Sequence, residues 1–442
     1  MNKITVEFKT ATGKVKPMHA VNNGPVHKFA EDQRISNLQH FIDAGIPYMR
    51  NHDAAFMSTY GGEHTVDVHN IFTDFDADPY DPASYDFIVT DEYMRVMEAT
   101  GGHCFYRLGA KIEHGIKKYG TLPPKDFHKW AVICEHIIRH YTEGWADGFH
   151  YNIEYWEIWN EPDLDPDDST NKRTWGGTRA QFYELYKIAA THLKTCFPHL
   201  KIGGPALARP GNLEWVEGFL ALGAPLDFFS WHVYGATVEK TVERVPKIRE
   251  LLDQYGYTET ESILNEWNYV RSFHGDEWAY SLQKEKELKG AAFIAGHMCA
   301  CQNLPLDMLM YYDARPCGMN GMFAPYQYNV RLKGYYPFKM FNELYKMGTG
   351  AKTTVQGENL YSCAAMDEKC SAVMLAHFND DDDAPAKEVI VELKDFVGKT
   401  ATVYLLDETH DMEPVWKETY FANSATLHLN VPNFSTYLIR FE

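Results

Sequence analysis

Positive charge is scarce in this chain of 442 residues, in which 42 Lys and Arg stand against 61 Asp and Glu, and the net charge is −19. This excess of negative charge repels a phosphate backbone, so we expect no nucleic-acid partner. The same repulsion argues against the anionic surface of a membrane. Long apolar runs are also missing, because no stretch approaches the roughly 18 apolar residues of a membrane span. The composition is that of a globular protein, and solubility is the simplest explanation of its negative charge.

Cysteine is sparse and scattered, and the eight cysteines form no Cys-x-x-Cys pair. Neither a zinc site nor a disulfide framework is indicated by such spacing, and reduced thiols fit best. The segment Met1–Glu7 lacks the apolar core of a signal peptide. We therefore expect a cytoplasmic protein without a metal or a cofactor.

The pattern of apolar and polar residues changes after Gly348-Thr349-Gly350, which divides the chain into two parts. In residues 17–347, apolar segments of strand length alternate with amphipathic segments of helix length, one of them from Gln283 to Gln302. The expected strands are Met18–Pro25, Ile46–Asp53, His103–Leu108, Tyr155–Pro162, Lys201–Leu207, Leu226–Gly235, Ile263–Asn268 and Met308–Tyr312. Eight such units in succession predict an α/β fold, a (β/α)8 TIM barrel.

Residues 348–442 form short, alternating, β-rich segments separated by turn signals, which predict a C-terminal antiparallel β-sandwich domain. Residues 1–16 read as strands with a turn at Thr12-Gly13, and we expect them to join this sandwich. The acidic run Asp380–Asp383 is expected to be a solvated hairpin tip. A second acidic stretch, 67–81, lies in a long loop over 54–82 that either binds calcium or covers a substrate.

Two of the expected barrel strands end in the same way, at Asn160-Glu161-Pro162 and at Asn265-Glu266-Trp267-Asn268. Pro162 cannot continue a β-ladder because it lacks an N–H, so Glu161 lies where a strand gives way to a loop. The carboxyl ends of barrel strands are where catalytic side chains lie. Two carboxyl groups, one protonated and one ionised, are what cleavage of a glycosidic bond requires.

These motifs resemble those of clan A retaining glycosidases and, within that clan, glycoside hydrolase family 39, which includes β-xylosidases and α-L-iduronidases. Supporting motifs are Asn22-Asn23-Gly24-Pro25, Asn51-His52-Asp53 and Trp231-His232-Val233-Tyr234. The resemblance covers about residues 17–347. It implies that Glu161 is the acid/base, that Glu266 is the nucleophile, and that Asn160 binds the 2-hydroxyl of the sugar.

The resemblance also implies five further contacts with the substrate. His232 and Tyr234 are expected near the nucleophile, with Tyr234 orienting it, while His52 and Asp53 meet hydroxyls at the non-reducing end. Trp267 is expected to be a platform for a sugar. Simpler readings stay open, since His232 and Trp267 are also suited to barrel packing and Asp53 to capping the next segment.

The expected function is therefore that of a retaining exo-glycosidase that acts on β-xylosides. Other glycones stay open, among them β-galactosides, α-L-arabinopyranosides, β-glucosides and α-L-iduronides. Arg50 and Arg107 also end strands, and either would pair with the glutamates or with the carboxylate of a uronic acid. A non-catalytic carbohydrate-binding barrel and a metal-dependent barrel enzyme are the alternatives of other classes. Similar family members often associate, which implies a homo-oligomer.

Overall fold

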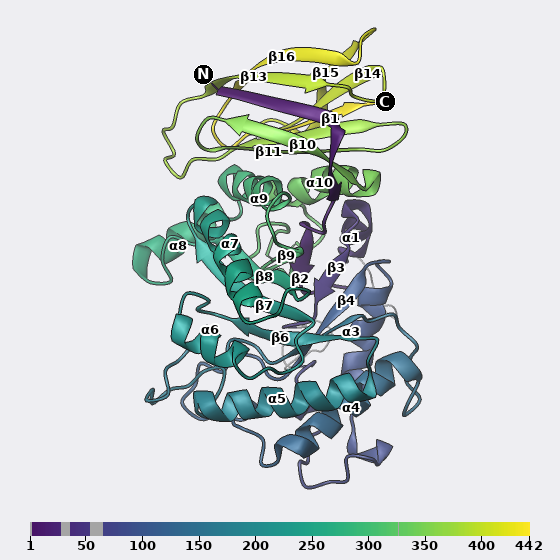
Figure 1. The fold of residues 1–442 in the computed structure, drawn as a ribbon, viewed down its shortest axis with the longest axis vertical. Coiled ribbons are helices and arrows are strands. Elements are labelled where there is room, and N and C mark those ends of the chain that lie inside the picture. Colours follow the sequence, from purple (N-terminus) through teal and green to yellow (C-terminus); the bar gives the residue numbers. More distant parts are fainter. Residues whose placement is uncertain (1, 28–35, 54–64, 326) are drawn as a thin grey trace.

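Eight parallel strands close into a barrel in the computed structural model, which describes residues 2–27, 36–53, 65–325 and 327–442. The strands follow one another around the barrel in chain order, and β9 closes it by pairing with β2 (Figure 1). They are β2 (Ala20–Asn22), β3 (Tyr48–Arg50), β4 (His103–Leu108), β5 (Tyr155–Ile158), β6 (Lys201–Leu207), β7 (Phe228–Gly235), β8 (Glu261–Tyr269) and β9 (Met308–Tyr311). The TIM barrel predicted from the sequence is confirmed.

Helices surround the barrel and connect its strands. They are α1 (Leu38–Ala44), α2 (Val68–Ile71), α3 (Ile88–Glu98), α4 (Phe127–Glu143), α5 (Arg179–Cys196), α6 (Leu213–Leu220), α7 (Glu239–Gln254), α8 (Gly275–Lys284), α9 (Leu288–Cys301) and α10 (Tyr336–Met347), with 3₁₀ turns η3 (Pro82–Ser84) and η4 (Lys333–Tyr335). Local sequence fixes several ends. Thr178 and Gln181 form a capping box at the start of α5, and the side chain of Asp126 caps α4.

The inside of the barrel changes from apolar to polar along the strands. The floor consists of side chains such as Phe105, Tyr155, Phe228 and Ile263. Side chains two residues apart on a strand share a face, so the next inward position lies directly above each of these. Those positions hold fully buried polar side chains: Asn22, Arg50, Arg107, Glu157, Ser230 and Asn265. The carboxyl end of the barrel is therefore a buried polar network rather than a hydrophobic core.

A nine-stranded sheet forms the second unit, in the order β15-β14-β17-β12-β11-β10-β1-β13-β16. Its strands are β1 (Asn2–Lys14), β10 (Thr349–Gln356), β11 (Leu360–Met366), β12 (Ser371–His377), β13 (Lys387–Lys394), β14 (Thr400–Leu406), β15 (Asp411–Thr419), β16 (Ser424–Val431) and β17 (Thr436–Phe441). Neighbouring strands are antiparallel, except that β1 runs parallel to β13. Ile4, Val6 and Phe8 of β1 belong to the core of this unit.

The first strand differs from the sequence expectation. Thr12-Gly13 is not a turn, because β1 continues through it and Gly13 pairs with Gly350 of β10. The register shifts between Glu7 and Ala11 and again between Ala11 and Gly13, which bends the strand without ending it. We propose that residues 1–16 and 348–442 form one sandwich unit and that residues 17–347 form the barrel unit.

The sheet rests on α9 and α10, which lie between it and the barrel (Figure 1). The sequence predicts that the tip at Asp380–Asp383 is solvated. In the structure, this tip contacts the barrel instead. Lys289 of α9, only 2% exposed, lies 2.9 Å from a carboxylate oxygen of Asp380 and 2.8 Å from one of Asp382. Arg271 also pairs with Asp380, at 3.0 Å, and the Tyr280 hydroxyl donates to Asp382 at 2.7 Å. We call this set of contacts the docking cluster.

The single helix predicted from Gln283 to Gln302 is wrong, because the chain forms α8 and α9 with a break at Glu285–Glu287. Gly290 allows the break, since a Cβ there would lie 2.4 Å from the carbonyl oxygen of Glu285. The sequence also predicts a first barrel helix from Arg34 to Ala44, and its start lies outside the described residues, as do residues 54–64 of the predicted acidic loop. In the described part of that loop, Asp74, Asp78 and Asp81 accept hydrogen bonds from nearby backbone N–H groups.

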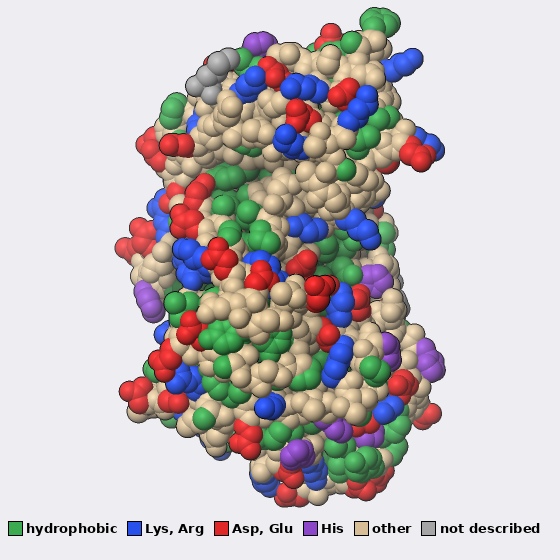
Figure 2. Space-filling view, viewed as in Figure 1, with side chains coloured by type: hydrophobic (Ala, Val, Ile, Leu, Met, Phe, Trp, Pro, Cys, Tyr) green, Lys and Arg blue, Asp and Glu red, His purple; other side chains and the backbone are tan. Residues whose placement is uncertain are grey.

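Acidic and basic side chains are interspersed over the face shown in Figure 2, on both units. Among the described residues, no helix combines the length and the apolar character that a membrane crossing requires. All eight cysteines are free thiols.

Candidate active site

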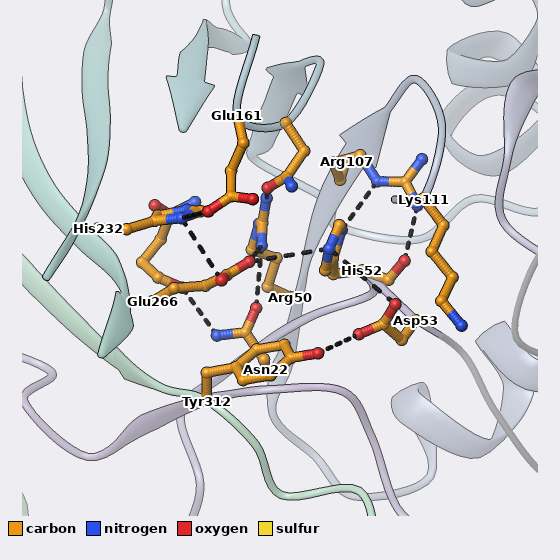
Figure 3. Close-up of polar contacts among 12 residues, drawn as sticks. Asn22, Arg50, His52, Asp53, Arg107, Lys111, Glu161, His232, Glu266 and Tyr312 are labelled. Carbon is orange, nitrogen blue, oxygen red and sulfur yellow. Dashed lines mark hydrogen bonds and ion pairs between the residues drawn. The ribbon is translucent and has the colours of Figure 1, made fainter. Parts of the chain in front are cut away.

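Glu161 stands just after β5, where the backbone leaves the barrel in an uncommon conformation. Trp159 and Glu161 have positive φ angles of 75° and 50°, which cost about 1–3 kcal/mol each for residues other than glycine. Two hydrogen bonds hold this turn. The Glu161 N–H donates to the carbonyl of Ala206 at 2.9 Å, and the Thr174 hydroxyl donates to the carbonyl of Glu161 at 2.6 Å. Backbone strain of this kind clusters at functional sites, and here it aims the Glu161 carboxyl at the barrel mouth (Figure 3).

The two strand-ending glutamates meet at one histidine. Nδ1 of His232, on β7, lies 2.9 Å from Oε1 of Glu161 and 3.4 Å from Oε2 of Glu266. One oxygen of each carboxyl and a ring nitrogen of His232 all lie within 4.8 Å of one another. Figure 3 shows both carboxyl groups converging on the imidazole from different strands. This separation is close to the roughly 5–5.5 Å between carboxyl groups in retaining glycosidases, and below the roughly 6.5–9.5 Å of inverting ones.

Glu266 is held as an anion by donors on both of its oxygens. Arg50 donates from Nη1 to Oε1 at 2.8 Å, and the Tyr234 hydroxyl donates to Oε2 at 2.8 Å. His52 lies further away, with Nε2 at 3.7 Å from Oε1. A charged donor and a hydroxyl on one carboxylate favour its ionised form.

Arg50 is the centre of the polar network. Its side chain is 0% exposed, and it also donates to Oε2 of Glu157 at 2.7 Å, to the side-chain oxygen of Asn160 at 2.6 Å and to that of Asn22 at 3.0 Å. Since arginine can only donate, the amide oxygen of Asn160 must face it. The NH₂ group of Asn160 is therefore the end that is free to donate to a ligand in the cavity.

The two glutamates differ in what surrounds them. Burial raises the pKa of Glu161 to about 7, although Arg50 and Arg173 lower it. Burial also raises the pKa of Glu266, which His232, Arg50 and the hydrogen bond from Tyr234 oppose. Burial lowers the pKa of His232 to about 4, so this imidazole is neutral near pH 7. The charged donor and the hydroxyl on Glu266 favour its ionised form, whereas the near neighbour of Glu161 is a neutral ring.

His52 follows β3 and lies beside Glu266, and Asp53 lies behind His52, with 4.0 Å between Nε2 of His52 and Oδ1 of Asp53 (Figure 3). Burial lowers the pKa of His52, so it too is neutral. Burial by itself raises the pKa of Asp53, but the nearby His52 and Arg315 lower it by more than burial raises it. The net pKa is therefore below the usual value, and the group stays ionised. The Tyr312 hydroxyl donates to Asp53 at 2.7 Å. These groups form a buried wall of donors and acceptors on one side of the mouth.

Arg107 does not contact either glutamate, although its position at a strand end made that one of two expectations. It donates to Asp67 at 2.6 Å, and its other contacts are the carbonyl of His52 at 2.6 Å and the ring of His52 at 3.2 Å. Arg107 therefore fixes the position of His52, and its charge is balanced by Asp67 of the acidic loop.

Trp267 does not reach the site, and the expectation that it is a sugar platform is corrected. Its ring is 1% exposed and stacks on His297 of α9 at 4.6 Å, with Phe293 at 6.1 Å. Regular alternation from the inward-facing Asn265 would turn Trp267 inward, but β8 is irregular between Leu264 and Trp267, so Asn265 and Glu266 both face the barrel interior and Trp267 faces outward. It is barrel packing.

A cavity of about 680 Å³ opens above the two glutamates. His52, Asn160 and Tyr234 line it together with Tyr312. The other described residues that line it are Ile112, His114, Glu161, Leu164, Arg173, Ala208, Arg209, Glu266, Phe273, His274, Trp278 and Met319. The cavity is the size of a small-molecule site.

Sequence reasoning missed several residues of this site. Three of them belong to the network around Arg50, which donates to Glu157 and to Asn22. The side-chain amide of Asn265 donates to Glu157 at 2.6 Å, and the side-chain amide of Asn22 donates to the backbone carbonyl of Asn265 at 2.7 Å. Glu157 was readable from alternation, because it lies two residues from the inward-facing Tyr155. Tyr312 was readable in the same way, because it lies two residues after the inward-facing Met310.

Two groups of side chains within the described residues have the geometry to hold a metal ion. One is Glu161, His232 and Glu266, where the Arg50 cation already occupies one oxygen of Glu266. The other is Glu135, His192 and Cys196 on α4 and α5, where Arg139 donates to Glu135 at 2.8 Å. In both groups an arginine repels a second cation.

The family model for glycosyl hydrolases family 39 matches residues 9–306. The chain is 33% identical over 127 residues to a β-xylosidase of Geobacillus stearothermophilus, which is 26% of this chain and 22% of that protein. It is 27% identical over 246 residues to a β-xylosidase of Caldicellulosiruptor saccharolyticus, which is 52% of this chain and 46% of that protein. The chain thus spans less than half the length of these curated relatives.

The fold is also that of solved structures. A glucosidase from Croceicoccus marinus superposes with a TM-score of 0.82 and 21% identity, over 100% of this chain and 98% of that one. At that identity, the likeness concerns the fold.

Proposed function

Because the chain belongs to glycosyl hydrolases family 39 and is a glycoside hydrolase, we propose that it is a retaining exo-glycosidase that releases xylose or a related sugar from β-linked glycosides. The observation that carries the proposal is the pair Glu161 and Glu266, which share one histidine nitrogen and have oxygens within 4.8 Å. That spacing leaves room for a sugar carbon but not for a water between carboxylate and sugar. Direct attack by a carboxylate, with retention, follows from it.

In the first step, Glu266 attacks the anomeric carbon and Glu161 gives its proton to the glycosidic oxygen. The bond from the anomeric carbon to that oxygen breaks, the aglycone leaves as an alcohol, and the sugar is esterified to Glu266. In the second step, Glu161 takes a proton from water, the water oxygen attacks the same carbon, and Glu266 is released. The two inversions give retention.

The pKa of Glu161 supports its two roles. A carboxyl with a pKa of about 7 holds a proton near neutral pH and can still release it. Arg50 lowers this pKa, and its charge is partly balanced by Glu266. Once Glu266 is an ester, Arg50 loses that balance and lowers the pKa of Glu161 further. Glu161 then suits the base of the second step, and a titration of the glycosyl-enzyme without such a fall would contradict this cycle.

The glycone is proposed to lie against His52, Asp53 and Tyr312, where buried polar groups match sugar hydroxyls. The NH₂ group of Asn160 is placed to donate to the 2-hydroxyl, because its oxygen is held by Arg50. Tyr234 positions Glu266 through its hydroxyl. His232 positions both glutamates. The buried glycone side favours release of one terminal sugar.

The test is a panel of nitrophenyl glycosides with xylose, galactose, arabinose, glucose and iduronic acid as glycones. Glucose is included because the fold resembles that of a protein described as a glucosidase. We expect one glycone to be released with its anomeric configuration retained, as read by NMR of the first product. Glu266→Gln should lose at least 10³-fold in kcat/KM, and the matched exposed variant Glu214→Gln should lose nothing. Release with inversion, or an active Glu266→Gln, would refute the mechanism.

A further inference from the structure

The cavity has two chemically different sides, and only the polar one is used by the glycone. We propose, resting on the proposed function, that Phe273 and Trp278 form an aglycone subsite that selects a flat apolar leaving group over a second sugar. Both residues follow β8, the strand that carries Glu266, and both line the cavity.

A run of aromatic rings leads outward from the nucleophile. Tyr234, whose hydroxyl contacts Glu266, meets the ring of Phe273 edge-on at 5.4 Å, and Phe273 meets Trp278 at 5.4 Å. Phe273 is 51% exposed although it borders a cavity. An aromatic ring left this open at a site is typical of a surface that a ligand covers.

We assign the aromatic side chains Phe273 and Trp278 to the leaving-group side of the cavity. The glycone side is fixed by His52, Asp53 and Tyr312, from the ends of β3 and β9. The leaving oxygen must lie at Glu161, after β5, which is across the barrel from β2 and β9. The apolar and aromatic side chains that line the cavity include Leu164, Ala208, Phe273, Trp278 and Met319.

The carboxyl and amide side chains that line the cavity are not free for a second sugar, and the other polar side chains there are arginines, histidines and tyrosines. The hydroxyls of a second sugar would need acceptors as well as donors, since unpaired buried polar groups are costly. Among the described residues that line the cavity, Glu161, Glu266 and Asn160 are the carboxyl and amide side chains, and all three serve the glycone or the bond that breaks. Arg173 is held by Asp165 at 2.7 Å, and Arg209 can only donate.

The segment that carries Phe273 and Trp278 is held in place before a ligand binds. α8, which carries Trp278, buries little besides Ser281. The docking cluster fastens it instead: Tyr280 of α8 donates to Asp382, and Arg271, just before α8, pairs with Asp380. Phe273 and Trp278 thus stand on a segment that the sandwich holds in place, which lowers the cost of ordering it around a ligand.

The probes are 2-phenylethyl and ethyl glycosides of the glycone found in the panel. Both leave as primary alcohols of similar acidity, so the ratio of their kcat/KM values reports the ring alone. We expect a ratio of at least about 10 in the wild type, because a buried phenyl ring contributes more than the 1.4 kcal/mol that a factor of ten requires. Phe273→Ala and Trp278→Ala should each lower the ratio several-fold, mainly through KM.

Trp278→Phe should restore most of the ratio, and Phe421→Ala, a change at a fully exposed ring on the sandwich, should leave it unchanged. A wild-type ratio near one, or the same ratio in both alanine variants as in the wild type, overturns the inference while the proposed function stands. Cleavage of a disaccharide of that glycone faster than of the 2-phenylethyl glycoside also overturns it. If no glycoside is cleaved, the proposed function fails, and the inference fails with it.

Discussion

Removing the hydroxyl of Tyr234 tests how Glu266 is kept ionised. The hydroxyl donates to Oε2 of Glu266 at 2.8 Å in a buried site, and this bond lowers the pKa of Glu266 against the larger, raising effect of burial. Tyr234→Phe keeps the ring and its contacts and deletes the donor. The protonated form of Glu266 then becomes relatively more stable, and its pKa rises.

The size of this rise follows from the contact. A hydrogen bond to a charged group contributes about 1.5–3 kcal/mol, and about 1.4 kcal/mol corresponds to one pKa unit. The proposed mechanism needs Glu266 ionised, so the acidic limb of the kcat/KM profile reports its pKa in the free enzyme. We expect Tyr234→Phe to move this limb about one to two pH units toward neutrality and to lower kcat/KM at the optimum at least tenfold.

The assay is the pH dependence of kcat/KM on the preferred nitrophenyl glycoside. Tyr312→Phe is the matched control, because it removes a neighbouring buried hydroxyl that donates to Asp53 rather than to Glu266. Its acidic limb should stay where it is in the wild type. An acidic limb of Tyr234→Phe that is unmoved, or that moves to lower pH, would refute the reasoning.

Three further predictions concern other groups. Activity should fall as the pH rises through about 7, because Glu161 loses its proton there, and a fall beginning two units higher would contradict that assignment. The raised pKa of Glu161 also makes its contribution to stability decline as the pH rises from about 4.5 to 7, so Glu161→Gln should raise the melting temperature more at pH 8 than at pH 5. Lys289→Met should lower the free energy of unfolding by roughly 1–3 kcal/mol, because it leaves Asp380 and Asp382 without their shared cation. Urea titration measures the free energy of unfolding, and Lys284→Met, a change at a more exposed lysine, is the control.

Much of the site was readable because the barrel turns chain order into spatial order. A strand that ends in Asn-Glu places its carboxyl at the mouth whichever helix follows, so Glu161 and Glu266 could be paired without any knowledge of loops. Asn160, His232 and Tyr234 were expected near the two glutamates from the resemblance to family 39. Distances were not readable, and the shared contact with His232 needed coordinates.

The failures have definite physical causes. Trp267 was expected to be a platform for a sugar from the family resemblance, and regular alternation from Asn265 did not exclude this; the irregularity of β8 between Leu264 and Trp267 turns the ring outward to α9. The helix break at Glu285–Glu287 was hidden because the residues there, Gln-Lys-Glu-Lys-Glu over 283–287, all have high helix propensity. The docking of Asp380 and Asp382 was missed because a run of four acidic residues looks solvated until a cation from a distant helix lies beside it.

The position of β1 bears on how the protein is made. This strand pairs with β10 and β13, which lie more than three hundred residues later in the chain. At roughly 5–20 residues per second on the ribosome, β1 waits tens of seconds for these partners. During that time its apolar side chains Ile4, Val6 and Phe8 have no sheet to cover them, which is a setting for aggregation. Lys3 and Lys9 next to them act as gatekeepers, and their replacement by neutral residues should lower the soluble yield more than the stability of the finished protein.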